Sequence, residues 1–149
     1  MAKSDILDYI CDIISEEACF ELRVTGYSML PLLGYDGDRI VIRRVDYGEE
    51  IVNRIAMFRT SQGKIILHRV VCMVDDIVVL QGDGNLQGYE HCPREEIIGV
   101  VESVVRKSGK LVSCTSRSWQ LKERLWLNFP YIVRRCVLGL LRRWLDKKR

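Results

Sequence analysis

The sequence predicts a mainly β domain that is preceded by an N-terminal helix and followed by C-terminal helices. Apolar residues recur at helical spacing over residues 4 to 18, directly after the capping residue Ser4. Short runs rich in β-branched residues then fill residues 20 to 114, and from about Ser118 the spacing becomes helical again. The chain has 149 residues, 48% of them hydrophobic, which is enough to bury one core.

Six apolar runs are expected to form the strands of a mostly antiparallel sheet. They cover residues 20–24, 39–43, 55–58, 64–74, 77–80 and 97–105. Turn residues at 34–37, 61–63, 75–76 and 82–84 separate several of them. After the sheet, Pro130 divides the helical segment, because proline is favoured at the start of a helix.

The charge of the chain changes sign near residue 116. Residues 1–116 contain 13 Lys and Arg against 18 Asp and Glu, a balance of −5, whereas residues 117–149 contain 10 against 2, a balance of +8. The sequence thus divides into a domain over 1–116 and a basic amphipathic helical tail over 117–149. In the tail, Arg134, Arg135, Arg142 and Arg143 are spaced to share one helix face. A basic tail predicts an anionic partner, either a membrane surface or a nucleic acid.

The sequence indicates neither a metal site nor another cofactor. The six cysteines form no CxxC pair and no zinc spacing, so we interpret them as small apolar residues in a reduced compartment. Residues 1–10 lack the continuous apolar run of a secretory signal. The longest uncharged run of the tail, 125–133, is far below the ~20 residues that cross a bilayer. We expect a cytoplasmic protein, with peripheral attachment at the inner membrane face through the tail.

Three short segments carry the residue types of a serine protease site. They are the nucleophile box (residues 26–31, Gly-Tyr-Ser-Met-Leu-Pro), the segment His68-Arg69-Val70, and the Gly-Asp-Gly-Asn segment (residues 82–85). Ser28 is the candidate nucleophile, His68 the general base and Asp83 the acid that orients the imidazole. A serine hydroxyl needs an adjacent base, and the base needs a third group that holds its tautomer. Each residue alone also fits a structural role, as a turn residue or a buried strand histidine.

This combination resembles the signal peptidase superfamily, over roughly residues 22 to 106. Around Ser28, the residues Gly26, Met29 and Pro31 match its Gly-x-Ser-Met-x-Pro box, and Gly37-Asp38 match the pair that follows. His68 stands where the common bacterial enzymes carry lysine, as in the endoplasmic-reticulum and archaeal branch, and residues 82–85 match the Gly-Asp-x-Asn motif of that branch. The resemblance implies a β-rich catalytic domain over 1–116 and a serine endopeptidase that removes a leader or signal-like segment from a precursor.

Two positions depart from the family pattern. Where the histidine-type enzymes carry a second aspartate this chain has Tyr89, with Glu90 beside it as the alternative acid. Where the classical enzymes have an oxyanion-hole serine it has Gly26, similar to the self-cleaving repressors of the superfamily. Losing one oxyanion donor costs on the order of 100-fold to 1000-fold in rate.

Two other functions stay open. One is a self-cleaving, regulatory relative of the repressors that binds DNA through its tail, although only about 25 residues precede Ser28 and leave no room for a helix-turn-helix domain. The other is a binding module that kept the fold without the activity. The function that we expect is the endopeptidase, with a precursor peptide or protein as substrate, an anionic membrane surface as partner of the tail, and no nucleic acid.

Overall fold

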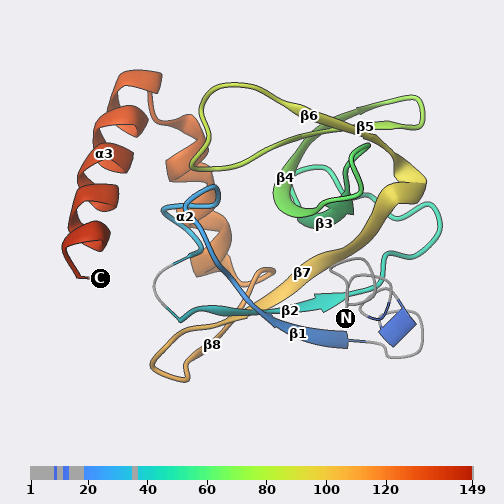
Figure 1. The fold of residues 1–149 in the computed structure, drawn as a ribbon, viewed down its shortest axis with the longest axis horizontal. Coiled ribbons are helices and arrows are strands. Elements are labelled where there is room, and N and C mark those ends of the chain that lie inside the picture. The colour runs from blue at the N-terminus through green and yellow to red at the C-terminus, as the bar shows by residue number, and fades with distance from the viewer. Residues whose placement is uncertain (1–8, 10–11, 14–18, 35–36, 149) are drawn as a thin grey trace.

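The described residues before 117 are organised around an antiparallel sheet of eight strands, curved into a half-barrel (Figure 1). The computed structural model describes residues 9, 12, 13, 19–34 and 37–148. Seven strands lie in the order β1-β2-β7-β3-β4-β5-β6, and β8 pairs with β7. The strands are β1 (Cys19–Arg23), β2 (Arg39–Arg43), β3 (Ile55–Arg59), β4 (Ile65–Val74), β5 (Ile77–Gln81), β6 (Glu90–Pro93), β7 (Ile97–Val105) and β8 (Leu111–Ser113).

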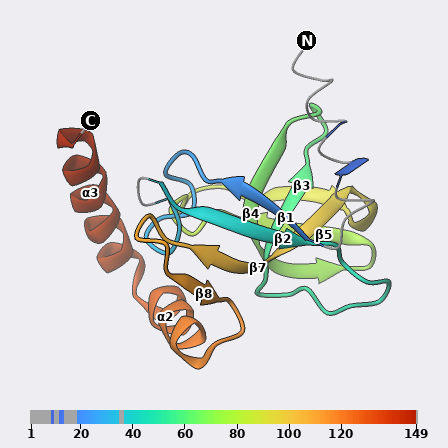
Figure 2. The same cartoon turned by 90° about the horizontal axis from the view of Figure 1, so that it is seen from below.

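The helices α2 (Arg117–Asn128) and α3 (Tyr131–Lys147) follow the sheet. Ser116 caps α2, because its hydroxyl accepts a hydrogen bond from the Trp119 backbone N–H at 3.3 Å. Pro130 precedes the first residue of α3. In both views α2 lies nearer the strands than α3 does (Figures 1 and 2). Among the residues that the structure describes, no helix combines the length and the apolar character needed to cross a membrane.

These elements confirm the mainly β prediction and the C-terminal helices. The expected N-terminal helix over residues 4 to 18 falls almost wholly outside the described residues. Two short strands were not predicted, β6 and β8. Residues 111–113 pair with β7 at its far end, and residues 90–93 pair with β5.

Alternating side chains build the interior. In β2, Ile40 and Ile42 are buried while their neighbours face outward, the period of two that a strand imposes. One cluster lies between β1, β2, β7 and the nucleophile box, and includes Trp119 of α2. A second cluster fills the space among β3, β4 and β5, with Phe58 and Val70 at its centre.

The helical segment packs on the β domain and is not a free tail. Leu30 of the nucleophile box is fully buried in a third cluster with Trp126 of α2 and with Leu138 and Leu145 of α3. The described part of the helical segment, residues 117–148, therefore shares a hydrophobic core with the β domain. The change of charge near residue 116 does not separate two independent cores.

Candidate functional site

The nucleophile box lies in the turns that follow β1, held between two apolar clusters. Met29 packs into the cluster of β1, β2 and β7, whereas Leu30 packs against the helices. Ser28, between the chain entering from β1 and these two anchors, is only partly buried. It lines a cavity of about 310 Å³ whose other walls include Leu22, Met57 and Ile65. The box therefore presents a serine at the edge of a largely apolar cavity.

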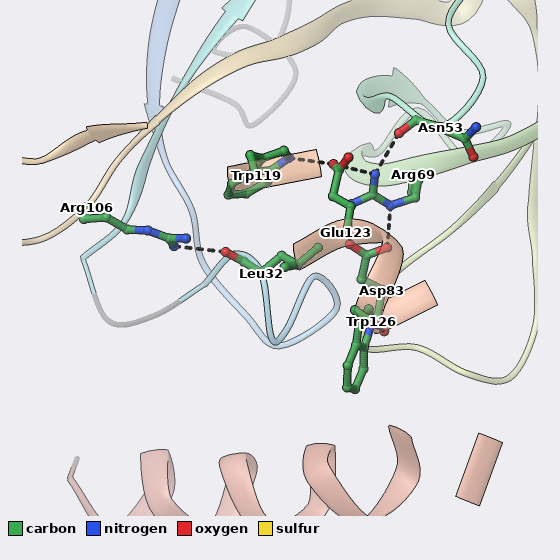
Figure 3. Close-up of polar contacts among 8 residues, drawn as sticks. All are labelled: Leu32, Asn53, Arg69, Asp83, Arg106, Trp119, Glu123 and Trp126. Atoms are coloured by element: carbon green, nitrogen blue, oxygen red, sulfur yellow. Dashed lines mark hydrogen bonds and ion pairs between the residues drawn. The ribbon is translucent and has the colours of Figure 1, made fainter. Parts of the chain in front are cut away.

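A partly buried ion pair closes the loop behind Ser28. Asp38, in the Gly-Asp pair that the sequence singled out, is buried and accepts a bond from Arg106 at 2.6 Å. Arg106 also donates to the Leu32 carbonyl at 2.9 Å (Figure 3). The Val24 N–H donates to the Asp38 carbonyl at 3.0 Å. The two ends of the loop are thereby tied together next to the serine.

His68 lies in β4 opposite Ala56 of β3 and is buried. Its ring is 6.1 Å from that of Phe58, and among the described residues its Nδ1 atom has no hydrogen-bond partner. Burial lowers the pKa of His68 below its ordinary value of 6.5, against the opposing charges of Glu90 and Asp83. The imidazole is therefore neutral at pH 7 and can accept a proton.

The Gly-Asp-Gly-Asn segment contacts both the nucleophile box and His68. The Gly84 N–H donates to the Ser28 carbonyl at 2.8 Å. A Cβ atom on Gly82 would clash with that carbonyl and lie 3.1 Å from Nε2 of His68, and a Cβ on Gly84 would clash with the Tyr27 carbonyl. Both positions require glycine because the segments meet backbone to backbone. The structure thus brings together three segments that are far apart in the sequence.

The sequence predicted that Asp83 orients His68, but in the structure the Asp83 carboxylate bonds to another residue. Its two carboxylate oxygens accept bonds from Nε and Nη2 of Arg69, each at 2.7 Å, and both side chains are buried. Arg69 follows His68 in β4, so the aspartate pairs with the neighbour of the histidine. Burial opposes the charge of Arg69, but the hydrogen bonds and negative charges of Asp83 and Glu123 together outweigh burial and raise the pKa of Arg69. Asp83 acts on the imidazole through its charge alone.

Glu90, the alternative acid, is the first residue of β6 and lies opposite Leu80 of β5. It also acts on His68 by charge, and more strongly than Asp83 does. Tyr89, which stands where the histidine-type signal peptidases carry a second aspartate, is exposed. Within the described part of the chain, neither acid hydrogen-bonds the free ring nitrogen of His68.

Helix α2 extends the Arg69–Asp83 pair into a network (Figure 3). Glu123 accepts from Arg69 at 2.8 Å and from the indole N–H of Trp119 at 2.6 Å, and Arg69 also donates to the Asn53 carbonyl at 2.7 Å. The indole N–H of Trp126 donates to the Asp83 carbonyl at 3.1 Å. Both tryptophans are buried. The Gly-Asp-Gly-Asn segment is therefore held by side chains of α2.

Helix α3 contacts the same region. Arg142 donates to the Gly84 carbonyl at 2.7 Å, and the Tyr27 hydroxyl donates to Asp146 at 2.6 Å. The Arg134 guanidinium lies 5.4 Å from the centre of the Trp126 ring. Two of the four arginines that the sequence placed on one helix face, Arg134 and Arg142, thus contact the rest of the protein.

Gly26 adopts a backbone conformation that favours glycine. Its φ angle is +87°, in the region that L side chains rarely occupy, although a Cβ atom there would meet nothing within 4 Å. A serine at this position would be strained by the backbone and not by crowding.

Four positioning residues were missed by sequence reasoning: Arg69, Glu123, Trp126 and Arg142. Arg69 carried a usable signal, since an arginine inside an apolar strand requires a buried acid, and Asp83 is close in the sequence. The other three lie on the helices, and only the tertiary packing shows which of their faces meets the site.

No group of three or more His, Cys, Asp or Glu side chains that could hold a metal ion occurs within the described residues. Comparison of the chain with protein-family models found no match, and comparison with curated proteins found none either.

Proposed function

We propose that this chain is a serine endopeptidase of the signal peptidase type that removes a leader or signal-like segment from a peptide or protein precursor. One observation carries the proposal. The nucleophile box, His68 and the Gly-Asp-Gly-Asn segment, which the resemblance names as parts of one site, are in contact through Gly82 and Gly84. A fold without peptidase activity would not require these three segments to lie in contact beside a serine.

The chemistry follows from the two side chains. The Ser28 hydroxyl attacks the carbonyl carbon of the scissile peptide while His68, neutral at pH 7, accepts the hydroxyl proton. The C–N bond of the tetrahedral intermediate then breaks, and His68 returns the proton to the leaving amine. Water attacks the resulting ester by the same route in reverse and releases Ser28. No metal or organic cofactor enters these steps.

The orienting acid is absent from this proposed mechanism. Because both oxygens of Asp83 bond to Arg69, we assign to Asp83 and Arg69 the positioning of the Gly-Asp-Gly-Asn segment, and to Ser28 and His68 a catalytic dyad. Packing against Phe58 and contact with Gly82 hold the imidazole instead of a carboxylate. The charges of Asp83 and Glu90 favour the imidazolium that forms during proton transfer.

The cavity beside Ser28 supports a peptide substrate. Its walls come from β1, β2, β3, the start of β4 and the nucleophile box, and the lining side chains Leu22, Ile40 and Met57 are apolar. A volume of about 310 Å³ fits small apolar side chains next to the scissile bond. The resemblance also implies small residues at that place.

The test is cleavage of a diverse mixture of synthetic peptides, with products identified by mass spectrometry. Ser28→Ala and His68→Ala should each lower cleavage by roughly 10⁴-fold or more, and the double variant should be no worse because the two residues act as a unit. Ser108→Ala, in the exposed turn after β7, and His91→Ala, at the other histidine, are the matched controls and should cleave normally. Normal cleavage by Ser28→Ala contradicts the proposal. Binding of peptides without cleavage by the unaltered chain supports the binding-module alternative.

A further inference from the structure

The outward surface of α3 combines exposed apolar residues with positive charge. Leu138 and Leu145 face the domain. The opposite side of the helix carries what we term the outer face, which consists of Ile132, Val133, Leu140, Arg143 and Lys147, with Trp144 at its edge, where the ring also lines a cavity bordered by the β domain. Ile132 is 73% exposed, Leu140 68% and Trp144 48%. Aliphatic and aromatic side chains of this size are seldom gathered on a surface that only water covers.

The acids of the helical segment do not share this face. Residues 117–149 contain two, Glu123 and Asp146, against ten Lys and Arg. Glu123 accepts hydrogen bonds from Arg69 and Trp119, and Asp146 accepts a hydrogen bond from the Tyr27 hydroxyl. Both therefore turn toward the β domain, and the charges left on the outer face are positive.

We propose that the outer face of α3 docks on an anionic membrane surface. An apolar centre with a basic end is the pattern of a helix that lies in the headgroup layer, and tryptophan is favoured at that depth. A second copy of the chain fits less well, because a two-fold interface uses the same face twice and would bury Arg143 and Lys147 against a face that offers no acid to pair with them. A nucleic acid would complement the positive charge of the outer face but would leave Ile132 and Leu140 exposed to water.

The contacts of α3 connect this surface to Ser28. Asp146 accepts from Tyr27, the residue before Ser28, and Arg142 donates to Gly84, whose N–H bonds to the Ser28 carbonyl. Docking would thus hold the nucleophile box at a fixed position relative to the bilayer. If the proposed peptidase activity is correct, the substrate is a precursor held at that surface.

Vesicle binding by the full chain tests the docking. Vesicles of phosphatidylglycerol and phosphatidylcholine in equal parts should sediment with the protein, and binding should weaken as salt rises. Among the three tryptophans, Trp144 is exposed and the other two are buried, so acrylamide quenching of the fluorescence should fall when vesicles are added. Ser28→Ala should bind as the unaltered chain does, which separates this test from that of catalysis.

Surface variants locate the contact. Ile132→Ser with Leu140→Ser should weaken binding by roughly 100-fold, and Arg143→Gln with Lys147→Gln by about tenfold. Val74→Ser and Lys64→Gln change an exposed apolar and an exposed basic residue on the β domain and should leave binding unchanged. Equal effects of both sets would overturn the assignment to α3. Binding to duplex DNA but not to vesicles would overturn it as well, and so would a dimer, seen by light scattering, that the Ile132 and Leu140 variants dissociate.

Discussion

His68 is a buried imidazole near the Phe58 ring, and its Nδ1 atom has no hydrogen-bond partner among the described residues. A buried polar atom without a partner costs about 1–3 kcal/mol, and a charged ring would cost more. The fold therefore favours the neutral ring, the form that a general base requires before it accepts a proton. Asp83 and Glu90 counteract this only in part, through their charges.

The pH dependence of cleavage should show the shifted pKa. Because burial lowers the pKa of His68 below 6.5, kcat/KM should rise with pH through a midpoint below 6.5 and stay constant toward neutral pH. Glu90→Gln removes the carboxylate whose charge raises this pKa more than that of Asp83 does, so the midpoint should move to lower pH. NMR titration of the imidazole checks both, with His91→Ala used to assign the two histidine signals. A midpoint at or above 6.5 would contradict a buried base.

At the scale of elements, the site depends on how closely two turns approach each other. The turn after β5 and the turns after β1 meet at Gly82 and Gly84, where no side chain fits. Arg69 and Trp126 hold the first of these turns, and Arg106 closes the second. Gly82 thus lies between the Ser28 carbonyl and the His68 ring, in close contact with both.

A methyl group at this contact should disturb the site. Gly82→Ala places a Cβ against the Ser28 carbonyl and 3.1 Å from Nε2 of His68, so the two turns must separate. We expect cleavage to fall by at least about 100-fold and the free energy of unfolding by about 1–3 kcal/mol, measured by peptide cleavage and urea denaturation. Gly139→Ala, in α3 with open space around it, is the control and should stabilise the protein by up to about 1 kcal/mol. Unchanged activity in Gly82→Ala would show that the contact does not position the dyad.

Sequence patterns predicted the elements with continuous apolar alternation and missed those without it. The bounds of β2 and β7 agree with prediction because β-branched residues fill both strands. The strand β6 reads Glu-His-Cys-Pro, a composition that carries no strand signal, and it forms because β5 offers an unpaired edge. Elements such as this depend on tertiary pairing.

The candidate site was predictable to the same extent. The motifs named Ser28, His68 and Asp83, which lie in segments that the fold brings together. In the structure Asp83 pairs with Arg69 and not with His68, although both of these neighbours in β4 contact the Gly-Asp-Gly-Asn segment. Spacing along a chain does not decide such a choice when two neighbouring residues both accept an acid as partner.

At the scale of the whole molecule, the two helices form one wall of the site. Glu123 and Trp126 of α2 hold Arg69 and Asp83, and α3 contributes Arg142 to the same segment. We therefore expect the domain over 1–116 to depend on residues 117–149. Removing them would expose Leu30, which is fully buried, and leave the ion pair of Arg69 partly uncovered.

Substitution of Trp126 tests this dependence without truncation. Trp126→Ala removes a buried ring from the cluster around Leu30 and should lower the free energy of unfolding by about 3–5 kcal/mol. Trp126→Phe keeps much of the packing but loses the hydrogen bond to the Asp83 carbonyl, so it should cost roughly 1–2 kcal/mol and slow cleavage while the chain stays folded. Trp144→Ala, at the exposed tryptophan of α3, should change stability by less than about 0.5 kcal/mol. Urea denaturation followed by circular dichroism, together with peptide cleavage, measures each variant. If Trp126→Ala were as stable and as active as Trp144→Ala, the helices would cover the site without supporting it. A helix wall that supports the site should pass the loss of the Trp126 ring on to the turn of Asp83, which contacts His68 through Gly82.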